Sequence, residues 1–177
     1  MEPVAEPAPF DARRGLLFVG ALKDEHSPNV DSLLWFVCNV LPLIDREIPE
    51  LDLNVAGHTA APSLVSIERQ NIHMKGRLES LDGLYRDSRV FIAPTRFAAG
   101  IPHKVHEAAA HGIPAVVTPL LARQLGWRHE REVLVGDGPE SFAEQCLRLY
   151  RDAGLWERIS AAGREAVARD CSEERFR

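Results

Sequence analysis

The residues with the clearest chemical pattern begin at Arg96, directly after an apolar run over 90–94. Gly100 follows, and then a helix that we expect over residues 103–111, with Lys104 in its first turn. A helix N-terminus presents backbone N–H groups and the positive end of the helix dipole, both of which favour an anion. Gly100 lets the backbone approach that anion, and the two cations balance its charge. The pattern therefore predicts a phosphate site; the alternative for Gly100 is an ordinary turn residue.

Glu107 lies one turn inside this predicted helix, three residues after Lys104 and four after His103. Residues at these spacings share one broad helix face. An ionised carboxylate accepts several hydrogen bonds, so Glu107 can hold two hydroxyl groups, as a ribose requires. The alternative is a surface carboxylate paired with Lys104. Val105 and Ala108 lie on the other side of the helix, where we expect them to pack on a sheet.

His106 and His111 bring to mind the His-Glu-x-x-His motif of zinc peptidases, but they are five residues apart instead of four. With about 3.6 residues per helical turn, this spacing puts the two imidazoles roughly 140° apart around the helix. They cannot share a metal ion on one face. We therefore expect no zinc site on this helix. For the chain as a whole we expect no metal and no other cofactor.

Glycines and cations also follow the other predicted strands. Ligands of open parallel sheets bind beyond the carboxyl ends of the strands. The residues at these ends are Gly20 and Lys23, Gly57 and His58, Lys75, Gly76 and Arg77, Thr95 and Arg96, and Thr118. A chain with a net charge of −5 thus places its bases along one rim of the sheet. The alternative is that glycines simply end strands and that these bases are solvated.

The hydrophobic pattern alternates between strands and helices. We expect strands at 16–19, 51–55, 72–75, 90–93, 115–117 and 132–135, and helices at 28–44, 62–69, 81–87, 103–111, 139–151 and 155–169. Ser27 is the predicted N-cap of the first helix, with Pro28 at its first position. Apolar strands that alternate with helices are typical of a parallel sheet covered on both faces. The prediction is a Rossmann-like α/β fold with about six strands.

The composition narrows the class of protein. A chain of 177 residues with 45% hydrophobic and 27% charged residues fits one globular domain, or one half of a two-domain enzyme. A pI near 5.8 argues against a nucleic-acid-binding surface. The longest apolar run, 33–44, is too short to span a bilayer, and residues 1–14 do not form a signal peptide. We expect Cys38 and Cys146 to be buried free thiols, which agrees with a cytoplasmic location.

The two ends of the chain suggest a piece of a longer protein. Residues 1–14 contain three prolines and are predicted to form a flexible linker or arm. Residues 172–177 begin like a capped helix and stop after about one turn. We therefore expect 15–177 to be one domain of a two-domain enzyme, truncated in its last helix.

Two other nucleotide- or phosphate-related classes are disfavoured. A receiver domain needs carboxylates at these strand ends to hold magnesium, and the rim has none in the right places. The dinucleotide fingerprint Gly-x-Gly-x-x-Gly is missing after the first strand, where residues 19–24 read Val-Gly-Ala-Leu-Lys-Asp. This argues against a dehydrogenase.

From about residue 15 to residue 177 the chain resembles the C-terminal, donor-binding domain of GT-B-fold glycosyltransferases of the group 1 or family 4 type. The resemblance is carried by residues 18–22, 28–31 with 34–36, 90–94 and 96–118. A subset of that family has the pattern Arg-Phe-Gly-Ala-Gly-Ile-x-x-Lys-Val-x-Glu-Ala, which residues 96–108 match closely.

The resemblance implies that a nucleotide-diphosphate sugar binds in a cleft between two domains. The implied diphosphate site contains Arg96, Gly100, Ile101 and Lys104, and the implied ribose site contains Glu107. The residues implied near the base or sugar are Gly20, Lys23, His58, Gly76, Arg77, Leu78, Ala99 and Thr118. The acceptor site and the catalytic residues would belong to an N-terminal domain, which would also make any membrane contact.

Three departures from the family pattern bear on mechanism. Family members carry two glutamates separated by seven residues, and Ala99 stands in the first position. The second departure is Ala98, where the closest pattern has glycine. The usual Arg and Lys pair after the first strand is absent, which leaves Lys23 and Arg96 as substitutes.

The resemblance implies a retaining transferase whose isolated domain binds nucleotide but transfers little sugar. The alternatives are a non-catalytic nucleotide-binding or scaffolding module of the same fold, or a GT-B-like nucleotide-sugar epimerase or phosphorylase. The family-level expectation for the pathway is assembly of bacterial surface polysaccharide or lipid-linked oligosaccharide.

Overall fold

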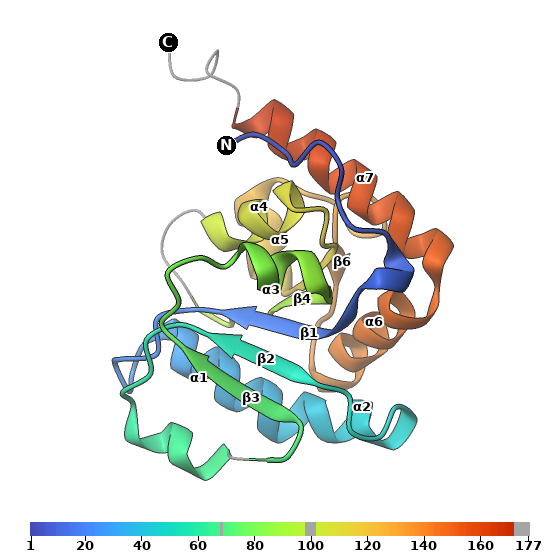
Figure 1. Cartoon of the computed structure of the whole chain (residues 1–177). Helices are drawn as coiled ribbons and strands as arrows, with labels where there is room; N and C mark the ends of the chain where they lie inside the picture. Colours follow the sequence, from blue (N-terminus) through green and yellow to red (C-terminus); the bar gives the residue numbers. More distant parts are fainter. Residues whose placement is uncertain (68, 98–101, 172–177) are drawn as a thin grey trace.

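The chain folds around one parallel sheet with the strand order β3-β2-β1-β4-β5-β6. The computed structural model describes residues 1–67, 69–97 and 102–171. The strands are β1 (Arg14–Val19), β2 (Leu53–Ala56), β3 (Ile72–Gly76), β4 (Ser88–Ala93), β5 (Ala115–Val117) and β6 (Leu134–Val135) (Figure 1). All five neighbouring pairs are parallel. The predicted Rossmann-like sheet of about six strands is confirmed.

Helices cover both faces of this sheet. Because side chains alternate along a strand, Leu16 and Phe18 of β1 enter one core and Leu17 and Val19 the other. The first core packs against α1 (Pro28–Trp35), η2 (Phe36–Val40), α2 (Leu41–Glu47), η3 (Pro62–Ile67) and α6 (Pro139–Arg151). The second packs against α3 (Asp82–Asp87), α4 (His103–Ala110) and α5 (Pro119–Leu125). Residues of α7 (Ala153–Asp170) enter both cores.

The helix predicted over 28–44 forms as three consecutive segments, α1, η2 and α2. Ser27 caps it as predicted, since its side chain accepts a hydrogen bond from the Val30 N–H at 3.3 Å. The middle segment, η2, is π-helical, and its wider turn changes which side chains face the sheet. Val37 and Val40 are buried there, whereas Cys38 is exposed. The prediction that Cys38 is buried was wrong; Cys146 is buried as predicted.

The structure has a helix, α5, over 119–125, where none is predicted from the sequence pattern. Its end signals are nevertheless present in the sequence. Thr118 is the N-cap, Pro119 occupies the first turn, and Gly126 ends the helix in the left-handed conformation with φ of 69°. Thr118 directly follows β5, so it lies at the carboxyl end of that strand and at the start of α5.

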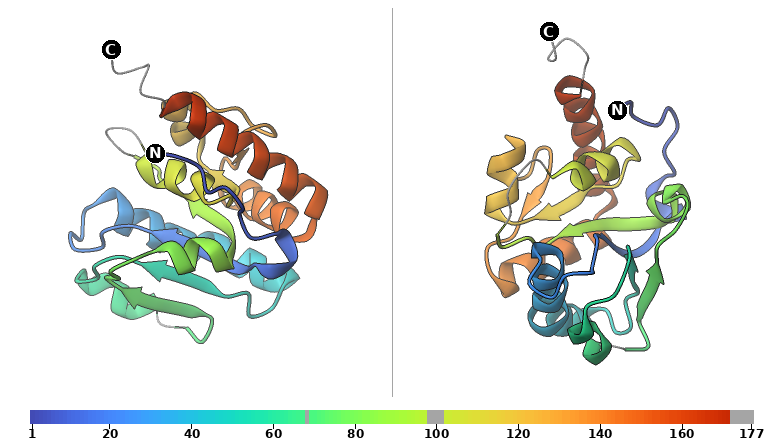
Figure 2. Two further views of the ribbon diagram at one scale, coloured as in Figure 1. Left: turned by 45° about the horizontal axis from the view of Figure 1, so that its top comes forward. Right: turned by 90° about the vertical axis from the view of Figure 1, so that its left-hand side faces the viewer.

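The amino-terminal segment packs along the domain, unlike the flexible arm that the prolines predicted. In both Figure 1 and the left view of Figure 2 it lies beside α7. The Val4 N–H donates to the Ala110 carbonyl at 2.8 Å, and Arg164 donates to the Val4 carbonyl at 2.7 Å. Arg13 is fully buried. The physical reason for the difference is that these polar contacts, which the composition does not reveal, hold the proline-containing segment in place.

Candidate functional site at the carboxyl edge of the sheet

The sheet reverses its strand order between β1 and β4, since β2 and β3 lie to one side and β5 and β6 to the other. Such a switch point leaves a crevice beyond the carboxyl ends of the two strands. The arrowheads of β1, β2 and β3 point to this edge at the left of Figure 1, and the right view of Figure 2 looks toward it. A hollow of about 350 Å³ lies here, and Val19, Asn29, Ala93, Thr95 and Lys104 are among its lining residues.

A second hollow of about 260 Å³, hereafter the outer hollow, adjoins the first and shares Val19 and Lys104 with it. It brings together side chains from the segments that follow β1, β2 and β3. The predicted site residues that line it are Gly20, Lys23, His58, Arg77, Leu78 and Lys104. The parallel sheet thus gathers at one place residues that are more than 80 positions apart in the sequence.

Backbone hydrogen bonds hold the segments around these hollows. The Gly20 N–H donates to the Ala56 carbonyl at 2.9 Å, and the Leu22 N–H donates to the His58 carbonyl at 2.8 Å. Gly57 donates in turn to the Gly76 carbonyl at 2.9 Å. Gly57 has a φ of 142°, and a Cβ on it would lie 1.8 Å from the Gly20 carbonyl oxygen. Only glycine fits there, so the ends of β1 and β2 approach closely and fix the loop that carries Lys23.

The cations of this edge have no carboxylate partner within the described ranges. Lys23, His58, Arg77 and Lys104 make no ion pair there. The N-cap of α4, Pro102, provides no side-chain hydrogen bond, and the positive dipole end of that helix lies in the same first turn as Lys104. In a chain of net charge −5, this is a local excess of positive charge suited to an anion such as a diphosphate.

Glu107 contacts Tyr85, not Lys104. The Tyr85 hydroxyl donates to Glu107 Oε2 at 3.0 Å, which joins α3 to α4. Burial, and next the charge of Glu107, raise the pKa of Tyr85, so the phenol stays protonated and remains the donor at neutral pH. Glu107 lies one helical turn beyond Lys104 and does not itself line either hollow. The alternative pairing of Glu107 with Lys104 does not occur in the described part of the chain.

Arg96 is engaged by a carboxylate. Its Nε donates to Asp31 Oδ2 at 2.9 Å, and a second guanidinium nitrogen donates to the other oxygen of Asp31. This hydrogen bonding raises the pKa of Arg96. Arg96 lines a third hollow of about 500 Å³, together with Trp35, Thr118 and Arg123, whereas Lys104 lines the other two. The structure thus does not bring the two predicted phosphate cations into one hollow.

The remaining predicted residues have structural contacts or fall outside the described ranges. The Thr118 hydroxyl donates to the Thr95 carbonyl at 2.6 Å while it caps α5, so it ties the end of β4 to that helix. Gly76 has a φ of 66° and ends β3, and it lines neither of the two adjoining hollows. Residues 99, 100 and 101 (Ala99, Gly100 and Ile101) lie outside the described residues.

Sequence reasoning missed three residues that hold this edge. Asn29 donates from its side chain to the Ala21 carbonyl at 3.1 Å, Asp31 binds Arg96, and Tyr85 binds Glu107. Asn29 and Asp31 follow the predicted cap Ser27, so a search for polar residues in the first turn of that helix could have found them. Tyr85 gives no such signal, because its role depends on how two helices pack.

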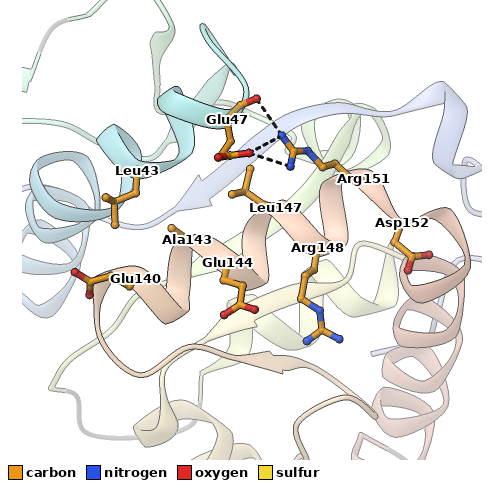
Figure 3. A pocket seen from close by; sticks show the side chains of 9 residues that line it. All are labelled: Leu43, Glu47, Glu140, Ala143, Glu144, Leu147, Arg148, Arg151 and Asp152. Atoms are coloured by element: carbon orange, nitrogen blue, oxygen red, sulfur yellow. Dashed lines mark hydrogen bonds and ion pairs between the residues drawn. The ribbon is translucent and has the colours of Figure 1, made fainter.

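A further hollow of about 460 Å³ lies between α2 and α6 and is shown in Figure 3. Leu43, Ala143 and Leu147 line it, and an ion pair between Glu47 and Arg151, with an oxygen–nitrogen distance of 3.3 Å, lies at its side. None of the predicted site residues is present, and no strand ends there. We therefore take the carboxyl edge as the candidate site.

Among the residues that the structure describes, no group of three or more His, Cys, Asp or Glu side chains could hold a metal ion. No helix among them is long and apolar enough to cross a membrane.

Comparison with known proteins agrees with this geometry. The family model described as "Glycosyl transferases group 1" matches residues 13–152. A Klebsiella pneumoniae protein described as an uncharacterized 44.6 kDa protein in the cps region is 24% identical over 163 residues, which cover 85% of this chain and 42% of the relative. The chain therefore spans less than half of the length of this curated relative.

Solved structures share the fold. The C-terminal domain of LpcC, a group 1 family glycosyl transferase from Francisella tularensis, has a TM-score of 0.71 at 14% identity, with 97% of this chain and 96% of that domain covered. An S. aureus TarM variant in complex with fondaparinux, alpha-GlcNAc-glycerol and UDP has a TM-score of 0.80 at 12% identity, with 99% and 36% covered. Since the family model spans most of the sequence and these structures share the architecture, the chain belongs to the group 1 glycosyltransferases of GT-B fold.

Proposed function

We propose that this chain is the donor-binding domain of a glycosyltransferase that transfers a sugar from a nucleotide-diphosphate sugar to an acceptor, with retention of configuration. One observation carries the proposal. At the switch point of the sheet, the N-terminus of α4 and the cations Lys104, Lys23 and Arg77 face adjoining hollows without a carboxylate partner among the described residues. A diphosphate supplies the negative charge that this arrangement lacks.

Each part of the donor has a group of suitable chemistry. The diphosphate binds at the first turn of α4 with Lys104, preceded by Gly100 and Ile101, and the ribose binds to Glu107. The base lies near His58, Arg77 and Leu78, which line the outer hollow. During transfer the cations stabilise the negative charge that grows on the departing nucleoside diphosphate, so no metal is needed. Arg96 joins the diphosphate only by leaving Asp31.

The relatives support two parts of the proposal, namely nucleotide binding and an acceptor site in another domain. The TarM complex contains UDP, and the LpcC structure that this chain covers almost completely is a C-terminal domain. The chain spans only 42% of its Klebsiella relative. We infer that another domain of the same protein supplies the acceptor site, and that this chain alone binds nucleotide but transfers little or no sugar.

The test is a calorimetric titration of the chain with UDP, GDP, ADP and their common sugar conjugates at low salt, where screening of the exposed cations is weakest. Selective binding of one nucleotide is the expected result and names the donor to try with the full-length protein. If neither the chain nor the full-length protein binds any of them, the proposal fails. Sugar transfer by the isolated chain would contradict the part that assigns the acceptor site to another domain.

A further inference from the structure

The contact between Tyr85 and Glu107 lies just behind the two adjoining hollows. Tyr85 is four residues after Leu81 and Glu107 is three after Lys104, and Leu81 and Lys104 both line the outer hollow. Side chains of a helix lean toward its N-terminus. The N-termini of α3 and α4 lie at the carboxyl edge, so the phenol and the carboxylate both lean toward the hollow. Their 3.0 Å hydrogen bond therefore lies about one helical turn behind Leu81 and Lys104, which line the hollow.

Tyr85 itself is held from three sides. Its ring is 2% exposed and stacks on His111 with 4.8 Å between centroids and 16° between planes. Phe91 of β4 packs against the same ring at 6.3 Å. The Tyr85 backbone carbonyl accepts a hydrogen bond from the buried guanidinium of Arg13 at 2.7 Å. These contacts leave the hydroxyl with one position, from which it donates to Glu107.

This bond leaves most of the carboxylate available. An ionised carboxylate has about four acceptor positions on its two oxygens, and the phenol occupies one of them. Without the phenol, Glu107 could rotate toward Lys104, because residues three apart on a helix are neighbours. Such an ion pair would consume both the ribose acceptor and the diphosphate cation.

We propose that Tyr85 is the positioning residue for ribose recognition: its hydroxyl holds the Glu107 carboxylate so that the free acceptor positions meet the two ribose hydroxyls. The inference rests on the proposed function, since it requires that a nucleotide binds with its ribose at Glu107. The phenol contributes through the carboxylate and does not contact the nucleotide.

The experiment uses Tyr85→Phe, which keeps the buried ring and removes only the hydroxyl. The affinities of the selected nucleoside diphosphate and of its 2′-deoxy analogue are measured for both proteins. We expect the variant to bind the ribonucleotide about three- to tenfold more weakly, the scale of one hydrogen bond. Affinity for the 2′-deoxy form should change less than about twofold, so the preference for ribose shrinks.

A matched control is Tyr150→Phe. It also removes a tyrosine hydroxyl, one that accepts a hydrogen bond from the Gly15 N–H at 3.1 Å, near the start of β1 and away from the hollows. Nucleotide affinity should not change in this variant. In a Glu107→Gln background, Tyr85→Phe should have little further effect, whereas a purely structural role for the hydroxyl would persist there.

The failures are distinguishable. If the unmodified chain binds a nucleotide and prefers ribose, but Tyr85→Phe keeps the same ratio of affinities, the positioning role is wrong and the proposed function stands. If the unmodified chain binds a nucleotide without any preference for ribose, Glu107 does not hold the ribose and the inference falls with that assignment. If neither this chain nor the full-length protein binds any nucleotide, the proposed function fails first.

Discussion

The cations at the amino-terminal segment and those at the carboxyl edge have opposite surroundings. Arg13 is fully buried, and its guanidinium donates to the carbonyls of Ala8, Tyr85, Ser88 and His111 at 2.7 to 3.1 Å. At the other edge, Lys23, Arg77 and Lys104 face open hollows and have no ion-pair partner among the described residues. Both regions contain cations, but only Arg13 uses its charge within the protein.

The difference separates structural cations from cations that are available to a ligand. Burial lowers the pKa of Arg13 to about 10, and the nearby Asp87 opposes this, so the side chain stays charged at neutral pH. Its carbonyl partners include Tyr85 in the last turn of α3 and His111 at the C-cap of α4, where the negative ends of the helix dipoles favour a cation. Arg96 is intermediate, because it lies at the carboxyl edge and yet is bound by Asp31.

The largest effect is expected for Arg13→Met. The variant leaves several buried carbonyls without a donor, at about 1–3 kcal/mol for each group that stays unsatisfied. We expect the free energy of unfolding to fall by at least about 3 kcal/mol, measured by urea denaturation. Arg14→Met is the control, because Arg14 is exposed and should change stability by less than about 1 kcal/mol. A small loss for Arg13→Met would mean that the segment 1–13 does not pack in solution.

Lys104→Ala tests a cation at the carboxyl edge of the sheet. Because no carboxylate balances this cation among the described residues, its removal should weaken nucleoside diphosphate binding by about 1.5–3 kcal/mol and leave stability nearly unchanged. Calorimetry gives the affinity. Lys75→Ala removes the same charge from an exposed position of β3 that does not line the hollows, and it should bind normally. Equal losses in both variants would indicate a general charge effect.

Arg96→Ala should have a smaller effect than Lys104→Ala. From the sequence alone, both substitutions are expected to cost the same 1.5–3 kcal/mol. The structure changes this expectation, because a ligand must first separate Arg96 from Asp31. We expect a loss of about 0.5–1.5 kcal/mol in nucleotide affinity. Asp31→Asn should strengthen binding if Arg96 reaches the diphosphate; no change in either variant would remove Arg96 from the site.

The smallest effect concerns His106, a buried group whose Nδ1 has no hydrogen-bond partner among the described residues. Burial lowers its pKa, with Asp170 opposing and His103 adding to the shift, and its ring packs edge-on against Trp127. As the pH falls, His106 therefore binds a proton at a higher pH in the unfolded chain than in the folded chain. The contribution of the neutral imidazole to the free energy of unfolding should be fully present above about pH 6.5. Below that pH the free energy of unfolding should fall, by at most about 1.4 kcal/mol per pH unit.

Unfolding measured between pH 5 and 7.5 checks this dependence. His106→Phe should make the curve flatter, because the group that resists protonation is gone. His26→Gln, at an exposed histidine, should leave the slope as it is. An unchanged slope in His106→Phe would show that other groups produce the pH dependence.

The fold, and the grouping of some candidate site residues at one edge of the sheet, could be predicted from local sequence patterns. Strand periodicity and the parallel arrangement are local properties of the sequence, and together they place Gly20, Lys23, His58 and Arg77 at one edge. The missed contacts join residues far apart: 22 positions for Tyr85 and Glu107, 65 for Asp31 and Arg96, and 72 for Arg13 and the Tyr85 carbonyl. They depend on how helices settle on the sheet, which periodicity does not encode.

The close approach of Gly57 to the Gly20 carbonyl limits how the site can be redesigned. A library that randomises every position around the outer hollow would lose most members at Gly57, where even a methyl group collides with backbone. Base preference should instead be altered through His58, Arg77 and Leu78, which line the hollow. Leu78 is already 41% exposed, so a larger side chain there has room to meet a different base.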